Sequence, residues 1–223
     1  MSLTVSVIMA VCDGERFLRA AIDSVLGEGV EELIVVDDGS TDATPSILAG
    51  YGRRIVAVRQ GAAGAATALN RGVAHATGEV LGFQDADDLW VAGRQAMLLA
   101  ALGHGVDAVR GSVEQFVSPD LPPDEAARLL VVDGPQASEL LTTLLVRRAA
   151  FDAVGLFDAQ LPSGYNIDWV SRSRLVPLRT SVVPDVVVRR RVHGANFGRT
   201  RAAGNRIDLT RVMRAHLERK RSQ

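Results

Sequence analysis

The chain has 223 residues, of which 47% are hydrophobic and 23% charged, enough apolar material for one α/β domain with at most a small appendage. Its formal net charge of −1 argues against a dedicated nucleic-acid-binding protein, and no apolar run approaches the length of a membrane-spanning helix. The N-terminus lacks the basic segment of a secretory signal, and the single cysteine, Cys12, excludes an internal disulfide and cysteine-based zinc sites. We therefore expect a cytoplasmic protein.

The first 83 residues alternate between strand and helix patterns. Apolar, largely β-branched runs predict buried strands at residues 4–10, 33–36, 55–58 and 80–83. Apolar residues at helical spacing predict helices between them, at residues 15–26, from about 42 to 51, and at 65–76. This alternation predicts a parallel sheet with helices on both faces, in which ligands bind at the carboxyl ends of the strands.

Acidic residues follow three of these strands: Cys12-Asp13, Asp37-Asp38 and the run Asp85-Ala86-Asp87-Asp88. One acidic turn alone is usually a solvated turn, because aspartate favours turns. Three acidic clusters on one edge of a sheet instead predict a nucleotide site with a metal-neutralised phosphate, and Mg²⁺ or Mn²⁺ is the cation that prefers such oxygen ligands. The chain has neither a Gly-x-Gly-x-x-Gly fingerprint nor a P-loop lysine, so the acidic turn and its metal are expected to compensate most of the phosphate charge.

In this order and spacing, the motifs resemble a family 2, GT-A-type glycosyltransferase over roughly residues 5–196. The resemblance rests on Val5–Met9, Val35–Asp42 (VVDDGSTD), Asn70–Gly72, Thr77–Glu79 and Asp85–Asp88, the last of which matches the family's DXD-type metal motif. It implies a GT-A fold, with a Rossmann-like, mostly parallel sheet covered by helices on both faces and a smaller acceptor-side mixed sheet. Residues 1–198 would then form the catalytic domain, with a nucleotide-binding half at about 1–90 and an acceptor-side half at about 91–198.

The resemblance also implies roles for single residues. Asp37 or Asp38, with Asp38 favoured, would bond to the base edge of a nucleotide, usually uracil. Asp85 would lie near the ribose or the metal, and Asp87 would ligate Mg²⁺ or Mn²⁺ on the donor diphosphate. Asp88 is expected instead to cap a helix that begins near Trp90.

Four further positions complete the implied donor-binding set: Ala10, Cys12, Asn70 and Ala86. Two positions depart from the family's pattern. The first loop usually reads Pro-x-Tyr-Asn where this chain has Ala10-Val11-Cys12-Asp13, so Cys12 replaces an aromatic that would lie against the base. Leu69 stands where the family often has an arginine. Asn70 has the alternative interpretation of a surface amide on its helix.

The second half carries the expected acceptor side. Its patterns predict a helix from about residue 91 to 102, strands at 106–117 and 182–191, and a short helix at 124–130. The family keeps its catalytic base in a Glu-Asp motif, and alignment on Trp169 and Arg172 places that motif on Tyr165-Asn166. An amide cannot take a proton, so Asp168 is the expected general base, with helix-terminus stabilisation as its alternative role.

The pattern Arg191-x-His193-x-x-Asn196 resembles the family's closing segment, in which the histidine reaches the donor phosphate or the metal. His193 is therefore an expected metal ligand, against the alternative of a structural histidine. Residues 199–223 are predicted to form a basic amphipathic helix. That helix could pack on the domain, pair with a second copy of the chain, or touch an anionic membrane surface.

Together these features predict an inverting transferase that moves a sugar from a nucleoside-diphosphate sugar, most simply a UDP-sugar, to an unidentified acceptor (saccharide, peptide or lipid-linked). Two rivals remain open. A sugar-phosphate nucleotidyltransferase also uses acidic metal sites, but it usually has a Gly-rich, basic loop after the first strand, which Val11–Gly14 does not supply. A nucleotide-sugar-binding module without a catalytic base is kept open by Asn166.

Overall fold

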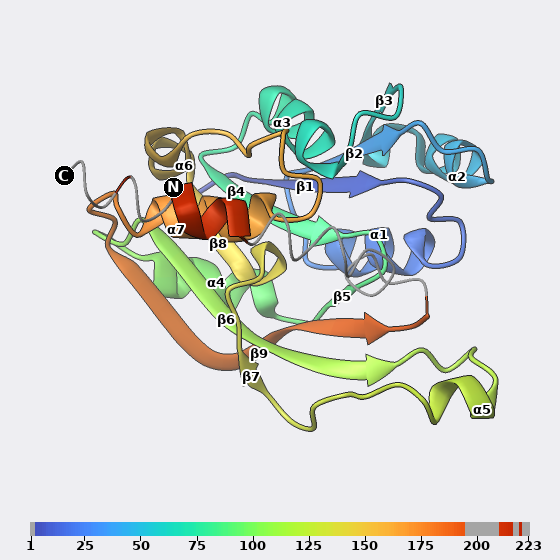
Figure 1. Ribbon diagram of the computed structural model, residues 1–223. Coiled ribbons are helices and arrows are strands. Elements are labelled where there is room, and N and C mark those ends of the chain that lie inside the picture. The colour runs from blue at the N-terminus through green and yellow to red at the C-terminus, as the bar shows by residue number, and fades with distance from the viewer. Residues whose placement is uncertain (1–2, 195–209, 216–218, 220–223) are drawn as a thin grey trace.

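A computed structural model describes residues 3–194, 210–215 and 219 of the chain. Its described strands form one nine-stranded mixed sheet in the order β3-β2-β1-β4-β8-β6-β9-β5, with β7 paired to β6 (Figure 1). The predicted α/β fold class is confirmed.

The parallel half of the sheet is built from the first four strands. They are β1 (Val5–Val11), β2 (Glu32–Asp38), β3 (Val56–Gln60) and β4 (Val80–Asp85). Helices α1 (Leu18–Leu26), α2 (Thr44–Tyr51) and α3 (Ala65–His75) connect them, with a short 3-10 turn, η1 (Gly52–Arg54), before β3. Because β1 pairs in parallel with both β2 and β4, the polar residues that follow these strands meet at one edge of the sheet.

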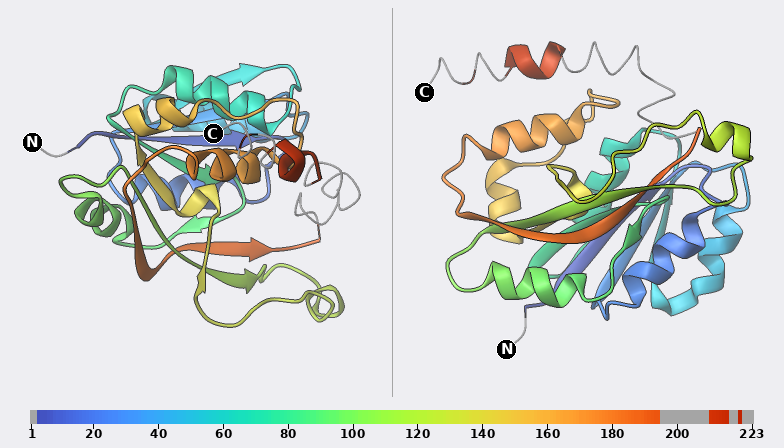
Figure 2. Two further views of the ribbon diagram at one scale, coloured as in Figure 1. Left: turned by 60° about the vertical axis from the view of Figure 1, so that its left-hand side comes forward. Right: turned by 90° about the horizontal axis from the view of Figure 1, so that it is seen from below.

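The second half extends the same sheet. Its strands are β5 (Leu89–Trp90), β6 (Ala108–Val117), β7 (Gln136–Ala137), β8 (Leu144–Arg147) and β9 (Thr180–Val192). Its helical segments are α4 (Arg94–Leu102), α5 (Pro123–Ala126), η2 (Leu141–Thr143), α6 (Arg148–Val154) and α7 (Tyr165–Ser173). β8 pairs antiparallel with both β4 and β6, so the expected acceptor-side strands are hydrogen-bonded to the nucleotide-side strands. β6 and β9 run side by side in parallel (Figure 2).

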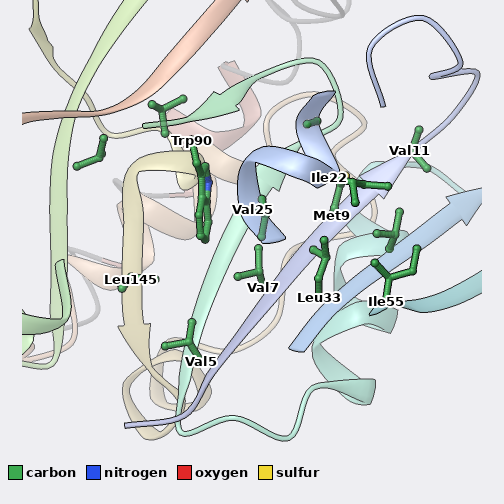
Figure 3. Close-up of a cluster of buried hydrophobic side chains, with 14 of the residues drawn as sticks. Val5, Val7, Met9, Val11, Ile22, Val25, Leu33, Ile55, Trp90 and Leu145 are labelled. Atoms are coloured by element: carbon green, nitrogen blue, oxygen red, sulfur yellow. The ribbon is translucent and has the colours of Figure 1, made fainter. Parts of the chain in front are cut away.

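Two apolar layers cover the faces of the sheet. Alternate residues of β1, such as Val7 and Met9, pack with Ile22 and Val25 of α1, as the close-up in Figure 3 shows, and that layer extends to α2 and α4. Ile8 faces the other side, in the layer built by α3, α6 and α7. Full burial of each such side chain stabilises the fold by roughly 1.5–3 kcal/mol.

One predicted boundary is corrected by the structure. The helix after the acidic turn begins at Arg94 rather than near Trp90, because Leu89 and Trp90 form β5, paired with β9. The predicted C-terminal helix falls largely outside the described residues, although residues 210–215 and 219 are helical and Val212 is buried. Within the described part of the chain, the structure has no helix long and apolar enough to cross a membrane.

Candidate functional site

Three carboxylates come together where β4 ends. Asp85, Asp87 and Asp88 each offer an oxygen, and these oxygens lie within 4.8 Å of one another. The turn is closed by a hydrogen bond from the Asp88 main-chain N–H to the Asp85 carbonyl, and the Gln84 side chain donates to the Asp88 carbonyl at 2.6 Å. The local sequence therefore folds the three acids onto one small patch.

The end of β9 holds this turn from the other side. The main-chain N–H of Arg191 donates to Asp88 Oδ1 at 2.8 Å, and Arg191 Nε donates to the Asp87 carbonyl at 2.9 Å. His193 Nε2 lies 3.0 Å from Asp87 Oδ2. Asp88 is thus a member of the acidic cluster that accepts a bond from β9, and the prediction that it caps a helix is wrong.

The charges in this cluster are poorly compensated by the protein. Although Asp85 reaches solvent, desolvation by the surrounding protein and the charge of Asp87 raise the pKa of Asp85 to about 7. Burial, followed by the charges of Asp87 and Asp85, raises the pKa of Asp88 well above its usual value. Both shifts show that the site disfavours the ionised form of its own carboxylates.

The residues present fit a hard divalent cation. Mg²⁺ and Mn²⁺ take oxygen ligands, and a cation placed among the three carboxylates would favour their ionised forms. The expected ligand Asp87 lies in this cluster together with Asp85 and Asp88, and Ala86 lies within the same turn. His193 contacts the Asp87 carboxylate directly.

The loops after β1 and β2 are tied to each other beside this turn. Asp13, at a left-handed φ of 50° that aspartate tolerates, accepts a hydrogen bond from the Thr41 N–H at 2.7 Å. Cys12 is exposed here, and partial desolvation, followed by the negative charges of nearby aspartates, raises the pKa of its thiol. Ala10 is the predicted donor-binding residue that lies on β1, and it pairs in register with Asp85 of β4.

Asp37 and Asp38 are both buried and already hold main-chain groups. Asp38 Oδ1 accepts from Gln60 Nε2 and from the Ala63 N–H, and Asp38 Oδ2 accepts from the Gly64 N–H, each at 2.8 Å. Asp37 Oδ1 accepts from the Ser40 N–H at 2.8 Å, and its Oδ2 lies 3.4 Å from Arg59 Nη1. A base contact by either residue stays a prediction, and Asp38 clearly organises the loop at residues 61–64.

Asn70 bonds through both side-chain atoms to the segment after α6. Its Nδ2 donates to the Phe157 carbonyl at 2.8 Å, and its Oδ1 accepts from the Phe157 N–H at 2.9 Å. These two bonds join α3 to the segment after α6. Asn70 therefore lies in an inter-element contact rather than on a free helix surface, and its donor-binding role stays a prediction.

Asp168 lies on α7 with only 2% of its surface exposed. Arg172 Nε donates to Asp168 Oδ2 at 2.7 Å, and Arg219 Nη1 donates to Asp168 Oδ1 at 3.0 Å. Both oxygens are therefore engaged by guanidinium groups. The base role of Asp168 stays a prediction that requires one of these bonds to open.

Three side chains that the sequence patterns did not single out also surround the site. The ring of Phe17 lies 4.7 Å from the ring of His193 and 4.7 Å from the Arg191 guanidinium. Burial and the charge of Asp85 raise the pKa of Tyr165, which places this phenol within electrostatic reach of the acidic turn. Arg190 of β9 is the third, and its positive charge opposes the upward shift of the Asp85 pKa. No local sequence pattern assigns these residues to the site, and only the folded structure brings them there.

A cavity of about 340 Å³ opens at the opposite edge of the sheet, between the amino ends of β1 and β2. Ser6, Glu32 and Thr77 line it, and they bond to one another there: Ser6 Oγ donates to Glu32 Oε2 at 2.6 Å, and the Thr77 N–H donates to the same oxygen at 2.9 Å. The length of β1 separates this cavity from the acidic turn, so it is not part of the candidate site.

This sheet, with its acidic turn at the end of β4, has the GT-A architecture. TarS of S. aureus, residues 1–349, aligns with a TM-score of 0.72 at 20% identity, covering 96% of this chain and 64% of that one. The mannosyltransferase PcManGT of Pyrobaculum calidifontis, solved with GDP-Man and Mn²⁺, aligns with a TM-score of 0.68 at 21% identity, covering 100% and 65%. TarS has also been solved with UDP and with UDP-GlcNAc.

The family itself follows from the sequence. The sequence model of the family described as "Glycosyl transferase family 2" matches residues 6–129, and the chain belongs to this family. An uncharacterized glycosyltransferase of Rickettsia typhi is 31% identical over 215 residues, covering 88% of this chain and 66% of that protein. One of Rickettsia felis is 28% identical over 210 residues, covering 85% and 34%. The chain thus spans between a third and two thirds of the length of these two relatives.

Proposed function

We propose that the chain transfers a sugar, with inversion, from a nucleoside-diphosphate sugar to an acceptor, with Mg²⁺ or Mn²⁺ on the donor diphosphate and uridine as the expected nucleoside. The observation that carries this proposal is the cluster of Asp85, Asp87 and Asp88 at the end of β4, whose oxygens lie within 4.8 Å of one another. A cation held there would neutralise charge on the leaving nucleoside diphosphate. Family membership and the donor complexes of the structural neighbours support the choice of donor.

The protein residues supply position and charge balance for this reaction. Arg191 fixes the turn through the Asp87 carbonyl and Asp88 Oδ1, so the carboxylates need little rearrangement when a cation arrives. Asp37 and Cys12 lie where the loops after β2 and β1 meet, next to Asp13 and Ser40, and we assign the nucleoside to this place. The diphosphate would then extend toward the acidic turn.

Inversion requires a carboxylate that takes the acceptor proton as the acceptor attacks the sugar. We assign this role to Asp168, which becomes available if Arg219, 38% exposed, releases Oδ1. The arrangement seen here also favours a second candidate function. A nucleotide-sugar-binding module would keep the acidic turn and have Asn166 and a doubly ion-paired Asp168 in place of a working base.

One experiment separates these functions. The full chain is incubated with Mn²⁺ and UDP-glucose, with and without candidate saccharide, peptide and lipid-linked acceptors, and free UDP is measured. The transferase predicts UDP release that is lost in Asp87→Ala and in Asp168→Asn, and is retained in Asp152→Ala, which alters an exposed acid on α6 far along the chain from the turn. GDP-mannose in a parallel series tests the choice of nucleoside.

The other outcomes would identify one of the two alternative functions. Binding of UDP-glucose or GDP-mannose without release, across the acceptor panel, would identify the binding module. Formation of pyrophosphate from UTP and a sugar phosphate would identify a nucleotidyltransferase and contradict the transferase.

A further inference from the structure

Near its end, β9 carries three consecutive arginines, and the structure gives each a different environment. Arg189 pairs with Glu114 at 3.8 Å and stacks on Phe116 at 4.8 Å. Arg191 is buried between Phe17 and Phe116, at 4.7 and 4.8 Å, and bonds to the acidic turn. Arg190 lies between them on the opposite face of the strand, since successive side chains of a strand alternate.

Arg190 is half-buried and, within residues 3–194, 210–215 and 219, forms no ion pair or side-chain hydrogen bond. Its neighbours place it at the acidic turn, because the next main-chain N–H along the strand donates to Asp88 Oδ1. Its positive charge also acts on the Asp85 and Asp88 carboxylates of that turn. A half-buried guanidinium on the strand that borders these carboxylates, and that pairs with none of them, has its donors available for another anion.

The site needs such a cation. Three carboxylates outweigh the charge of one divalent cation, so a cation on the turn does not by itself balance a diphosphate. The sequence has no phosphate-loop lysine. Among the nearby arginines, Arg191 is held by the Asp87 carbonyl and Ser118, and Arg59 by Asp37 and Ser40.

We propose that Arg190 is a catalytic residue that binds the donor diphosphate beside the metal and stabilises the charge on the leaving nucleoside diphosphate. This inference rests on the proposed function and adds a protein cation to it. A guanidinium can donate two parallel hydrogen bonds to phosphate oxygens, which a point charge cannot. Arg191 has a distinct role, because it positions the carboxylates rather than reaching the ligand.

The test uses the full chain and the variants Arg190→Met, Arg190→Lys and Arg189→Met. The Arg189 variant is the matched control, since it removes a neighbouring arginine of the same strand that stacks on Phe116 but does not touch the turn. Calorimetry measures Mn²⁺ alone, and then UDP or GDP in saturating Mn²⁺. Release of UDP or GDP from the corresponding sugar nucleotide gives kcat and KM.

Arg190→Met should bind UDP or GDP about 10- to 100-fold more weakly in the presence of Mn²⁺, as expected for the loss of hydrogen bonds between charged groups. Its affinity for Mn²⁺ alone should be unchanged or up to about 10-fold higher, because a positive charge beside the carboxylates is gone. Arg190→Lys should recover part of the nucleotide affinity, and kcat should fall in Arg190→Met.

Two results would overturn the inference while leaving the proposed function intact. One is a nucleotide affinity and kcat of Arg190→Met equal to those of Arg189→Met. The other is weaker binding of Mn²⁺ alone in Arg190→Met, which would show that Arg190 builds the acidic turn instead of binding the ligand. Failure of the unaltered chain to bind UDP or GDP with Mn²⁺ would contradict the proposed function, and the inference with it.

Discussion

Nε2 of His193 lies 3.0 Å from Oδ2 of Asp87, although 106 positions separate them in the chain. The contact links the residue directly after β9 to the acid that we propose as a metal ligand. It orients the Asp87 carboxylate, and an oriented ligand binds a cation with less loss of conformational freedom.

Replacing His193 by alanine should therefore weaken Mn²⁺ binding by about 10-fold, the lower end of the effect of losing a group that orients a metal ligand. Calorimetric titration with Mn²⁺ measures this affinity. His75→Ala, which removes an exposed histidine at the end of α3, is the control and should bind Mn²⁺ like the unaltered chain. Equal affinities in the two variants would show that the contact does not support metal binding.

Asp168→Asn should lower the free energy of unfolding by about 2–4 kcal/mol, because it leaves the Arg172 and Arg219 guanidiniums without their carboxylate. Arg219→Ala should cost less than about 1 kcal/mol, since Arg219 is 38% exposed and its ion pair is partly screened by solvent. Urea unfolding measures both values. An Asp168→Asn protein as stable as the original but unable to turn over substrate would favour catalysis as the main role of Asp168.

Gly72 and Gly50 both lie inside helices, and the same substitution should have opposite effects at the two positions. An alanine Cβ at Gly72 would lie 2.4 Å from Ile8 Cγ2, so Gly72→Ala should destabilise the fold by about 1–3 kcal/mol through overpacking of α3 on the sheet. Gly50 of α2 has no atom within 4 Å of that point, so Gly50→Ala should stabilise by roughly 0.5–1 kcal/mol. Thermal unfolding measures both, and a destabilisation of equal size at the two positions would contradict the overpacking at Gly72.

The ion pair between Asp107 and Arg179 should make a pH-dependent contribution to stability. Hydrogen bonds from the Arg179 side chain and N–H lower the pKa of Asp107 to about 2, below its value in the unfolded chain. The stabilisation is therefore fully present above about pH 4 and is lost as the pH falls toward about 2. Its size should be about 1 kcal/mol, because Arg179 is 67% exposed.

Urea unfolding of Asp107→Asn and of the unaltered chain at pH 7 and pH 3 measures this difference, which should shrink at the lower pH. Asp124→Asn, at a 71% exposed carboxylate with only a 3.9 Å ion pair, is the control and should show little difference at either pH. If Asp107→Asn lowers the free energy of unfolding by the same amount at both pH values, the lowered pKa of Asp107 is contradicted.

The parallel half of the fold could be predicted because buried strands leave continuous apolar runs, and the acidic residues stand directly after them. β5 could not, since two residues carry no periodicity and Leu89-Trp90 looks like the start of a helix. The roles of Asp88 and Asn70 depend on Arg191 and Phe157, at separations of 103 and 87 residues, which no local pattern reveals. The Asp168–Arg172 pair, four residues apart on α7, was open to prediction from helical spacing.

The contacts that Arg191 and His193 make with the acidic turn have a consequence for synthesis on the ribosome. The four parallel strands and all three acids of the turn emerge within the first 88 residues, but the groups that fix the turn, Arg191 and His193, are made about a hundred residues later. The nascent nucleotide half therefore exposes an unpaired β4 edge until β8 is made, and an unsupported acidic turn until the end of β9 is made. The proposed metal site should be among the last parts of the molecule to form, so the onset of Mn²⁺ binding would mark the completion of folding.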